Sequence, residues 1–118
     1  MSDGAFPCSV VRGVPVVTVP EEVDFTTAGQ LGAALKAAAG GHGQLVADMT
    51  RTRFCDLATL RALTAAHDCA RASGGGLLVV TSSPLVLRTF ALTGLDLVIA
   101  TFASLETAVA RACAGRVV

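Results

Sequence analysis

The 118-residue sequence predicts a single α/β domain built on a mixed β-sheet. Apolar, β-rich segments alternate with segments whose apolar residues recur at helical spacing, and this alternation predicts parallel strands joined by crossover helices. The chain opens with two apolar runs around Arg12 and Gly13, which indicate a β-hairpin and make the sheet mixed. The length fits one hydrophobic core, so we expect residues 1–118 to form one domain with its core at about 9–114.

The hairpin leads through a loop to the first helix. Its strands are expected at Ser9–Val11 and Val14–Val19, and Pro15 favours an edge position for the second strand, because proline removes a ladder donor. Thr27 is the expected N-cap of the helix, with Gln30 three residues on as its partner in a capping box. The expected apolar face of this helix comprises Leu31, Ala34, Leu35 and Ala38.

The middle of the chain predicts a buried strand and a second helix. The strand is expected at Leu45–Ala47, and a loop at 49–55 leads to the helix, which Asp56 is expected to cap. The expected inner face of this helix comprises Thr59, Ala62, Leu63, Ala66, Cys69 and Ala70. The expected outer face comprises Arg61, Asp68 and Arg71.

The last third of the chain predicts two more strands and two more helices. A strand is expected at Leu77–Thr81, and a helix starts at Ser83, with proline at its first position, and stops at Gly94. The final strand is expected at Leu97–Ile99, and Ser104 is the expected cap of the final helix. The expected buried face of that helix comprises Leu105, Ala108, Val109 and Ala112.

The composition argues against several classes of function. Nine basic and nine acidic residues balance, whereas nucleic-acid binding needs clustered Lys and Arg. The segment Met1–Gly4 has neither the basic nor the apolar region of a signal peptide, and no segment reads as a membrane span. We therefore expect a cytoplasmic chain that binds neither nucleic acid nor membrane. Because 53% of the residues are hydrophobic and only 15% are charged, apolar surface is expected to remain for a partner.

The cysteines and histidines do not form a metal-binding or catalytic pattern. The four cysteines are Cys8, Cys55, Cys69 and Cys113, none of them in a C-x-x-C pair, and there are only two histidines. We expect no metal and no cofactor. Cys69 and Cys113 are expected in the core, and Cys8 is expected to be exposed. No base and no anion-binding turn accompany Cys55, so we expect no catalytic residue and no enzyme activity.

Three segments together resemble the STAS domain, and specifically the small stand-alone anti-sigma factor antagonists. Residues 20–28 (P-E-E-V-D-F-T-T-A) are similar to the family's G-E-L-D-x-x-T-A turn into the first helix. Residues 45–56 resemble its central strand and switch loop, V-L-D-L-S…F-[LIM]-D. Residues 92–96 resemble the L-x-x-x-G-L that ends the third helix.

The resemblance implies a mixed sheet with helices mainly on one side, and a bacterial regulator of transcription in the stress response. Such antagonists bind an anti-sigma factor, usually of the serine-kinase type, and so release a sigma factor. Their switch is the phosphorylation of a serine in D-S-S-G at the start of the second helix. This chain has D-L-A-T, which places Ala58 at the phosphoacceptor position, and alanine has no hydroxyl to phosphorylate. Three interpretations follow. In the first, which we favour, the phosphorylation switch is lost and binding is constitutive or under other control; in the second, Thr59 is a displaced acceptor; in the third, the partner has changed.

The expected partner-binding surface combines the turn before the first helix, the loop 50–55 and the start of the second helix. Its residues are Asp24, Thr26, Thr27, Arg53, Cys55, Asp56, Leu57, Ala58, Thr59 and Arg61. A scaffold module of a larger stress-sensing assembly and a homodimer remain open alternatives. A redox-regulated antagonist is another, since the helix N-terminus lowers the pKa of the Cys55 thiol, although the neighbouring carboxylate raises it. A buried, inert thiol is the favoured interpretation of Cys55.

Overall fold

The computed structural model describes residues 6–40 and 43–115, and it confirms the predicted alternation of strands and helices. The strands are β1 (Cys8–Val11), β2 (Val14–Thr18), β3 (Glu22–Val23), β4 (Gln44–Asp48), β5 (Phe54–Cys55), β6 (Gly76–Val80) and β7 (Ala100–Phe102). The helices are α1 (Ala28–Ala39), α2 (Leu57–Ala72), α3 (Pro84–Thr93), the short 3-10 helix η2 (Leu95–Leu97) and α4 (Leu105–Gly115).

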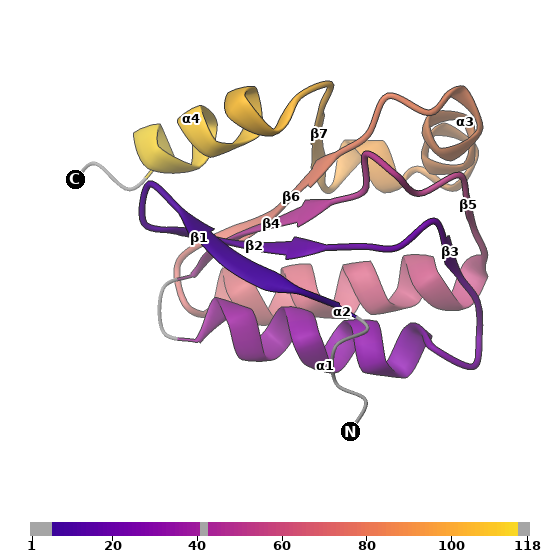
Figure 1. Ribbon diagram of the computed structural model, residues 1–118, viewed down its shortest axis with the longest axis horizontal. Coiled ribbons are helices and arrows are strands. Elements are labelled where there is room, and N and C mark those ends of the chain that lie inside the picture. Colours follow the sequence, from indigo (N-terminus) through magenta and orange to yellow (C-terminus); the bar gives the residue numbers. More distant parts are fainter. Residues whose placement is uncertain (1–5, 41–42, 116–118) are drawn as a thin grey trace.

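Five strands form one mixed sheet in the order β1-β2-β4-β6-β7. β1 and β2 are antiparallel, and the remaining neighbours are parallel. Because parallel strands end at the same edge of a sheet, the segments that follow β2, β4 and β6 meet there. Figure 1 shows β3, β5 and α3 at this edge, where open α/β sheets carry their binding sites.

The hairpin at the start of the chain turns at Arg12 and Gly13, whose φ angles are 52° and 83°. Two consecutive positive φ values are typical of the tight hairpin turn that matches the strand twist. The expectation that Pro15 lies on an edge strand is wrong, because β2 pairs with β1 on one side and β4 on the other. The strand accommodates the proline because pairing with β4 begins only at Val16, and Pro15 faces Val10 of β1.

The sheet separates two hydrophobic cores of unequal size. The larger core lies between one face of the sheet and α1, α2 and α3, with Leu31, Leu35 and Phe90 fully buried in it. The smaller core lies on the other face, where Ala108 and Val109 of α4 cover the sheet. Figure 1 shows α1 and α2 side by side on one face and α4 on the opposite face. The helices therefore lie mainly on one side, as the resemblance implied.

A second, two-stranded sheet is a feature that the sequence did not predict. β3 and β5 pair in parallel, with Glu22 opposite Phe54 and Val23 opposite Cys55. Both segments were expected to be loops, because two residues are too few to show a strand pattern. Their pairing joins parts of the chain that are distant in sequence, and it fixes the loop before α1 to the loop before α2.

The expected strand at Leu97–Ile99 is wrong. The backbone N–H of Leu97 donates to Gly94 O at 3.1 Å, and the N–H of Ile99 donates to Leu95 O at 2.9 Å. These turn hydrogen bonds follow Gly94, which adopts the left-handed conformation with φ 79°. Leu97 therefore ends the 3-10 helix η2, Val98 and Ile99 continue the turn, and the strand starts at Ala100.

The burial of two α2 side chains differs from expectation. Cys69 was expected in the core, but it is exposed. His67 is buried instead, with only 8% of its surface exposed, and its Nδ1 accepts a hydrogen bond from the N–H of Leu77 at 3.1 Å. The inner face of α2 is thus rotated toward His67. Cys8 is exposed as expected, and Cys113 is half-buried and packs against the smaller core.

Candidate functional site

The start of α2 is held by Asp56. This residue has extended backbone angles, and its Oδ1 accepts a hydrogen bond from the N–H of Thr59 at 3.0 Å, which is the geometry of an N-cap. A cap of this kind stabilises a helix by about 1 kcal/mol, and its charge interacts favourably with the helix dipole. The predicted cap is confirmed. Asp56 therefore has a structural role whatever else it contacts.

Thr59 is completely buried beneath the first turn of α2. Its hydroxyl lies 3.2 Å from Val23 O and 3.0 Å from Asp56 Oδ1, and its single proton is shared between these two acceptors. The side chain thus ties β3 to the start of α2. The proposal of Thr59 as a displaced phosphoacceptor is not supported, because a kinase cannot reach a buried hydroxyl. For the same reason Thr59 lies beneath the predicted surface and not on it.

Cys55 lies under the same surface. Only 5% of it is exposed, as part of the larger core. Burial, together with the adjacent charge of Asp56, raises the pKa of the Cys55 thiol to about 11. Thiol oxidation proceeds through the thiolate, which is scarce at neutral pH for such a group. Both properties argue against redox control through Cys55.

The turn before α1 is organised by Asp24. Its Oδ1 accepts from the N–H of Thr26 at 3.0 Å and from the hydroxyl of Thr26 at 2.5 Å. The two hydrogen bonds from Thr26 hold the pKa of Asp24 below its ordinary value of 3.8. This is the Asx turn that a short acidic side chain forms with the backbone two residues on.

The capping box expected for α1 is wrong. Thr27 precedes the helix, but its backbone is already helical and its side chain makes no capping hydrogen bond. An N-cap side chain reaches the helix from extended backbone, so the helical angles of Thr27 direct its hydroxyl elsewhere. The hydroxyl accepts instead from the N–H of Asp24 at 3.2 Å. Thr27 thus strengthens the Asp24 turn.

Arg53 lies in the loop between β4 and β5. Its guanidinium forms an ion pair with Glu21 at 2.8 Å, and the two side chains are 77% and 54% exposed. Its backbone N–H also donates to Glu21 O at 3.0 Å. An ion pair this exposed contributes at most about 1 kcal/mol. Arg53 therefore marks the outer edge of the site and is accessible.

Between the starts of α1 and α2 lies an open hollow of about 620 Å³, which we call the α1–α2 groove. It is lined by Phe25, Ala28, Gly29, Asp56, Leu57, Ala58, Arg61 and Ala62. Phe25 is 77% exposed and Leu57 is 57% exposed, so two large apolar side chains face solvent beside it. Ala58 is half-buried in its wall and packs against the larger core.

The structure brings part of the predicted surface together. Asp56, Leu57, Ala58 and Arg61 all line the α1–α2 groove, and the Asp24 turn reaches it through Phe25. Four residues that line the groove were not among the predicted site residues: Phe25, Ala28, Gly29 and Ala62. The signal for Phe25 was available, since an aromatic residue in a polar turn has no predicted core to enter. Gly29 carried no signal, because it occupies an ordinary helical position.

The described part of the chain holds neither a metal-binding cluster nor a helix that could span a membrane. No group of three or more His, Cys, Asp or Glu residues within 6–40 and 43–115 is placed to hold a metal ion. Among the helices of those same ranges, none has the length and apolarity needed to cross a bilayer.

The sheet, the helices on its two faces and the groove at the start of α2 together define a small α/β module with exposed apolar side chains at one edge. The chain belongs to the STAS domain family, whose model matches residues 7–108. The predicted resemblance and fold class are thereby confirmed. No curated protein matches the chain.

Several solved structures share the fold. A Thermotoga maritima protein, provisionally described as an anti-sigma factor antagonist, has a TM-score of 0.85 and 18% identity, over 94% of this chain and 97% of that one. An anti-sigma factor antagonist from Mycobacterium paratuberculosis has a TM-score of 0.83 and 28% identity, over 96% and 97%. The Bacillus cell fate determinant SpoIIAA in its phosphorylated form has a TM-score of 0.68 and 22% identity, over 91% and 98%.

Proposed function

We propose that this chain is an anti-sigma factor antagonist that binds a serine-kinase-type anti-sigma factor and thereby releases a sigma factor for transcription. The binding surface is the α1–α2 groove with the exposed side chains at its edge. The chain acts by binding its partner and not as an enzyme, in the bacterial cytoplasm and as part of a stress response. Membership of the STAS family and the likeness to solved antagonists support this role.

The observation that carries the proposal is the position of Ala58. It is the second residue of α2, and it lies in the wall of the groove next to the exposed Leu57. An uncharged methyl group at this point gives a partner an apolar contact that needs no desolvation of charge. Since residues with large exposed apolar side chains serve as anchors in protein interfaces, Phe25 and Leu57 are the expected anchors.

The absence of a hydroxyl at Ala58 makes the binding independent of phosphorylation at this position. A phosphate at a helix start is tolerated by the helix itself, because the first turn has unpaired N–H groups and the positive end of the dipole. The same phosphate adds roughly −1.5 to −2 charges and must be desolvated inside an interface, which opposes binding. Ala58 removes this control and leaves the antagonist constitutively active.

The predicted site residues divide into two roles. Leu57, Ala58, Arg61 and Thr26 are accessible to a partner to different degrees, and we propose that they contact it together with Phe25. The remaining predicted residues shape the loops beneath or beside them. They are Asp24, Thr27, Arg53, Cys55, Asp56 and Thr59.

The test introduces a charge or a hydroxyl at Ala58. Purified serine-kinase-type anti-sigma factors from the same organism are titrated, with ADP present, against the parent, Ala58→Asp and Ala58→Ser by calorimetry. We expect Ala58→Asp to weaken binding at least about tenfold, which corresponds to ~1.4 kcal/mol. Ala58→Ser should bind like the parent in ADP and become phosphorylated and released in ATP.

The matched control is Ala110→Asp, the same substitution at an exposed position of α4. It should leave the affinity unchanged. If Ala58→Asp binds as tightly as the parent, the assigned surface is wrong. If the parent binds none of the anti-sigma factors and elutes from size exclusion as a large homomeric particle, the scaffold alternative replaces the proposal.

A further inference from the structure

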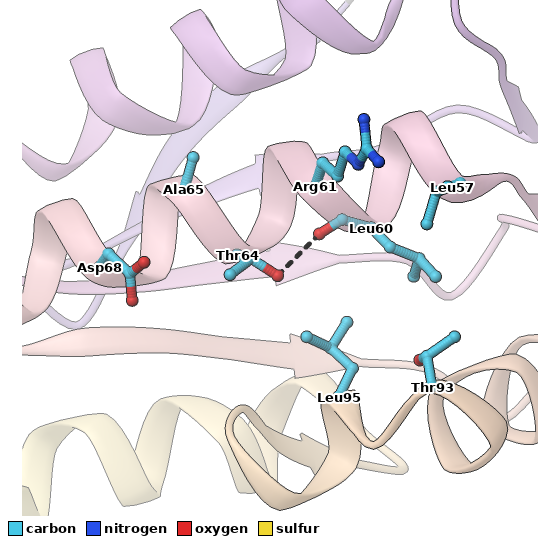
Figure 2. Close-up of a pocket in the computed structure, with 8 residues that line it drawn as sticks. All are labelled: Leu57, Leu60, Arg61, Thr64, Ala65, Asp68, Thr93 and Leu95. Carbon is cyan, nitrogen blue, oxygen red and sulfur yellow. Dashed lines mark hydrogen bonds between the residues drawn. The ribbon is translucent and has the colours of Figure 1, made fainter.

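A second groove lies on the other side of α2, between this helix and the end of α3 with η2. It has a volume of about 360 Å³, and we call it the α2–α3 groove. It is lined by Leu57, Leu60, Arg61, Thr64, Ala65, Asp68, Thr93 and Leu95. Figure 2 shows Leu57 and Leu60 of α2 pointing toward Thr93 and Leu95 across the gap. The groove is therefore walled by apolar carbon on both sides.

The groove is less polar than the presence of Thr64 and Thr93 suggests, because both hydroxyls are already hydrogen-bonded. The hydroxyl of Thr64 donates to Leu60 O at 2.9 Å, and that of Thr93 donates to Thr89 O at 2.9 Å. Each hydroxyl is thus engaged with a carbonyl of its own helix, a pattern common for threonine within helices. The groove offers no set of convergent, unpaired polar groups of the kind that orients a small molecule. Its surface is suited to apolar side chains.

Two unpaired charges stand along the same groove. Arg61 and Asp68 are both exposed and line it, and among residues 6–40 and 43–115 the only ion pair is that of Arg53 with Glu21. The two positions are seven residues apart on α2, which separates them by about 10 Å along the helix axis. An occupant that complements them carries an acidic group near Arg61 and a basic group near Asp68.

We propose that the α2–α3 groove receives an amphipathic helix of the partner protein, with an acidic side chain opposite Arg61 and a basic side chain opposite Asp68. This inference rests on the proposed function, because it assigns the occupant to the same anti-sigma factor. Leu57 and Arg61 line both grooves, so the second groove continues the first around α2. The partner therefore contacts α2 from both sides.

A helix fits these features better than an extended segment does. Two charges about two helical turns apart match side chains at positions i and i+7 of a helix, with apolar residues at i+3 and i+4 between them. An extended segment needs an exposed strand edge for its backbone hydrogen bonds, and the walls of this groove are helices.

The test uses Ala65, which lines this groove only and is exposed. Ala65→Arg places a long, charged side chain at the edge of the groove, and it keeps α2 intact because arginine is nearly as good a helix former as alanine. Its matched control is Ala110→Arg on α4. Against the same purified anti-sigma factors, we expect Ala65→Arg to weaken binding about tenfold, as the loss of an interface anchor does, and Ala110→Arg to have no effect.

A photo-crosslinking side chain at position 65 identifies the occupant. We expect the crosslinked peptide to belong to a helix of the anti-sigma factor with an acid and a base seven residues apart. Asp68→Lys should weaken binding, and exchanging the partner's base for an acid should restore it. Crosslinks to a second copy of this chain, or to a partner segment without these charges, overturn the inference.

The outcomes separate this inference from the proposed function. If Ala58→Asp loses binding while Ala65→Arg binds like the parent, the second groove is empty in the complex and only the further inference fails. If neither variant changes the affinity, the α2 surface as a whole is not the binding site, and both proposals fail.

Discussion

The two ends of α2 are held in place differently. Hydrogen bonds from Asp56 and Thr59 hold the first turn, whereas the last turns are held by the buried His67 and by the close approach of the Gly75 backbone to Gly43. At the start, Thr59 hydrogen-bonds to Val23 O of β3 and Asp56 caps the helix. These contacts lie beneath or beside the helix. They leave Leu57 and Ala58 available to a partner.

The opposite end of α2 is attached to the sheet through a different set of contacts. The imidazole of His67 accepts a hydrogen bond from the N–H of Leu77, near the start of strand β6. Gly75, in the loop between α2 and β6, lies so close to Gly43 that the N–H of Gly76 donates to Gly43 O at 2.8 Å. This end thus fixes the helix to the sheet. The comparison shows how one helix can be rigidly held and still offer a surface for binding.

The largest loss of stability is expected from a substitution at Gly75, where the backbone lies against that of Gly43. A Cβ at Gly75 would lie 2.0 Å from the carbonyl carbon of Gly43 and 2.6 Å from the N of Gln44. Backbone atoms cannot move aside as a side-chain tip can, so Gly75→Ala should lower the free energy of unfolding by at least about 3 kcal/mol. Urea denaturation followed by circular dichroism measures this loss.

The control for this substitution is Gly29→Ala in α1, where an added Cβ meets nothing within 4 Å. Alanine is a better helix residue than glycine, so this variant should be stabilised by roughly 0.5–1 kcal/mol. If Gly75→Ala unfolds at the same urea concentration as the parent, the backbones do not touch in solution, and the contrast between the two ends of α2 is lost.

A smaller loss of stability is expected from a substitution at the start of α2. Thr59→Val keeps the shape of the side chain but removes the hydroxyl, which leaves Val23 O without that partner in a buried place. An unsatisfied buried group costs about 1–3 kcal/mol, and the free energy of unfolding should fall by that amount. Urea denaturation again gives the value. Affinity for the partner should fall as well, because the start of α2 loses its tie to β3.

Thr64→Val is the matched control for the threonine substitution. Its hydroxyl bonds only to a carbonyl of its own helix, which the backbone ladder of the helix also uses. The free energy of unfolding should change by no more than about 0.5 kcal/mol. Equal losses in both variants would mean that the hydroxyl of Thr59 contributes nothing particular to the site.

Local sequence signals predicted those parts of the fold that local physics determines. Asp56 and Ser83 were recognised as caps because a short polar residue before an apolar helical pattern has one favourable use. Thr59 was expected to face inward because its position follows from the periodicity of α2. The mixed sheet, with parallel strands after an opening hairpin, also followed from the alternation of elements.

The parts that were missed depend on contacts between distant segments. The pairing of β3 with β5 involves two residues on each side, which give no periodicity to detect. The groove beside Phe25 exists only because the fold brings the start of α2 next to the start of α1. The inner face of α2 was predicted wrongly at Cys69, which is exposed, whereas His67 is buried. The position of the helix on the sheet decides which of these two neighbouring side chains is covered.

The smallest effect should appear as a pH dependence at His67. Burial, and next the positive charge of Arg71, holds the pKa of His67 below its ordinary value of 6.5, while Asp68 acts in the opposite direction. As the pH falls below 6.5, the unfolded chain takes up this proton before the folded protein does, so stability declines. The ring in its neutral form also accepts the N–H of Leu77, which a protonated ring cannot do.

Urea midpoints between pH 8 and pH 5 test the His67 prediction when the parent is compared with His67→Gln. The glutamine carbonyl can still accept a hydrogen bond but does not titrate in this range. The parent should lose stability more steeply than the variant as the pH falls below 6.5, and the carboxylates common to both cancel in the difference. Parallel curves would show that His67 is protonated equally in both states, and the attachment at this end would then depend on the glycine contact alone.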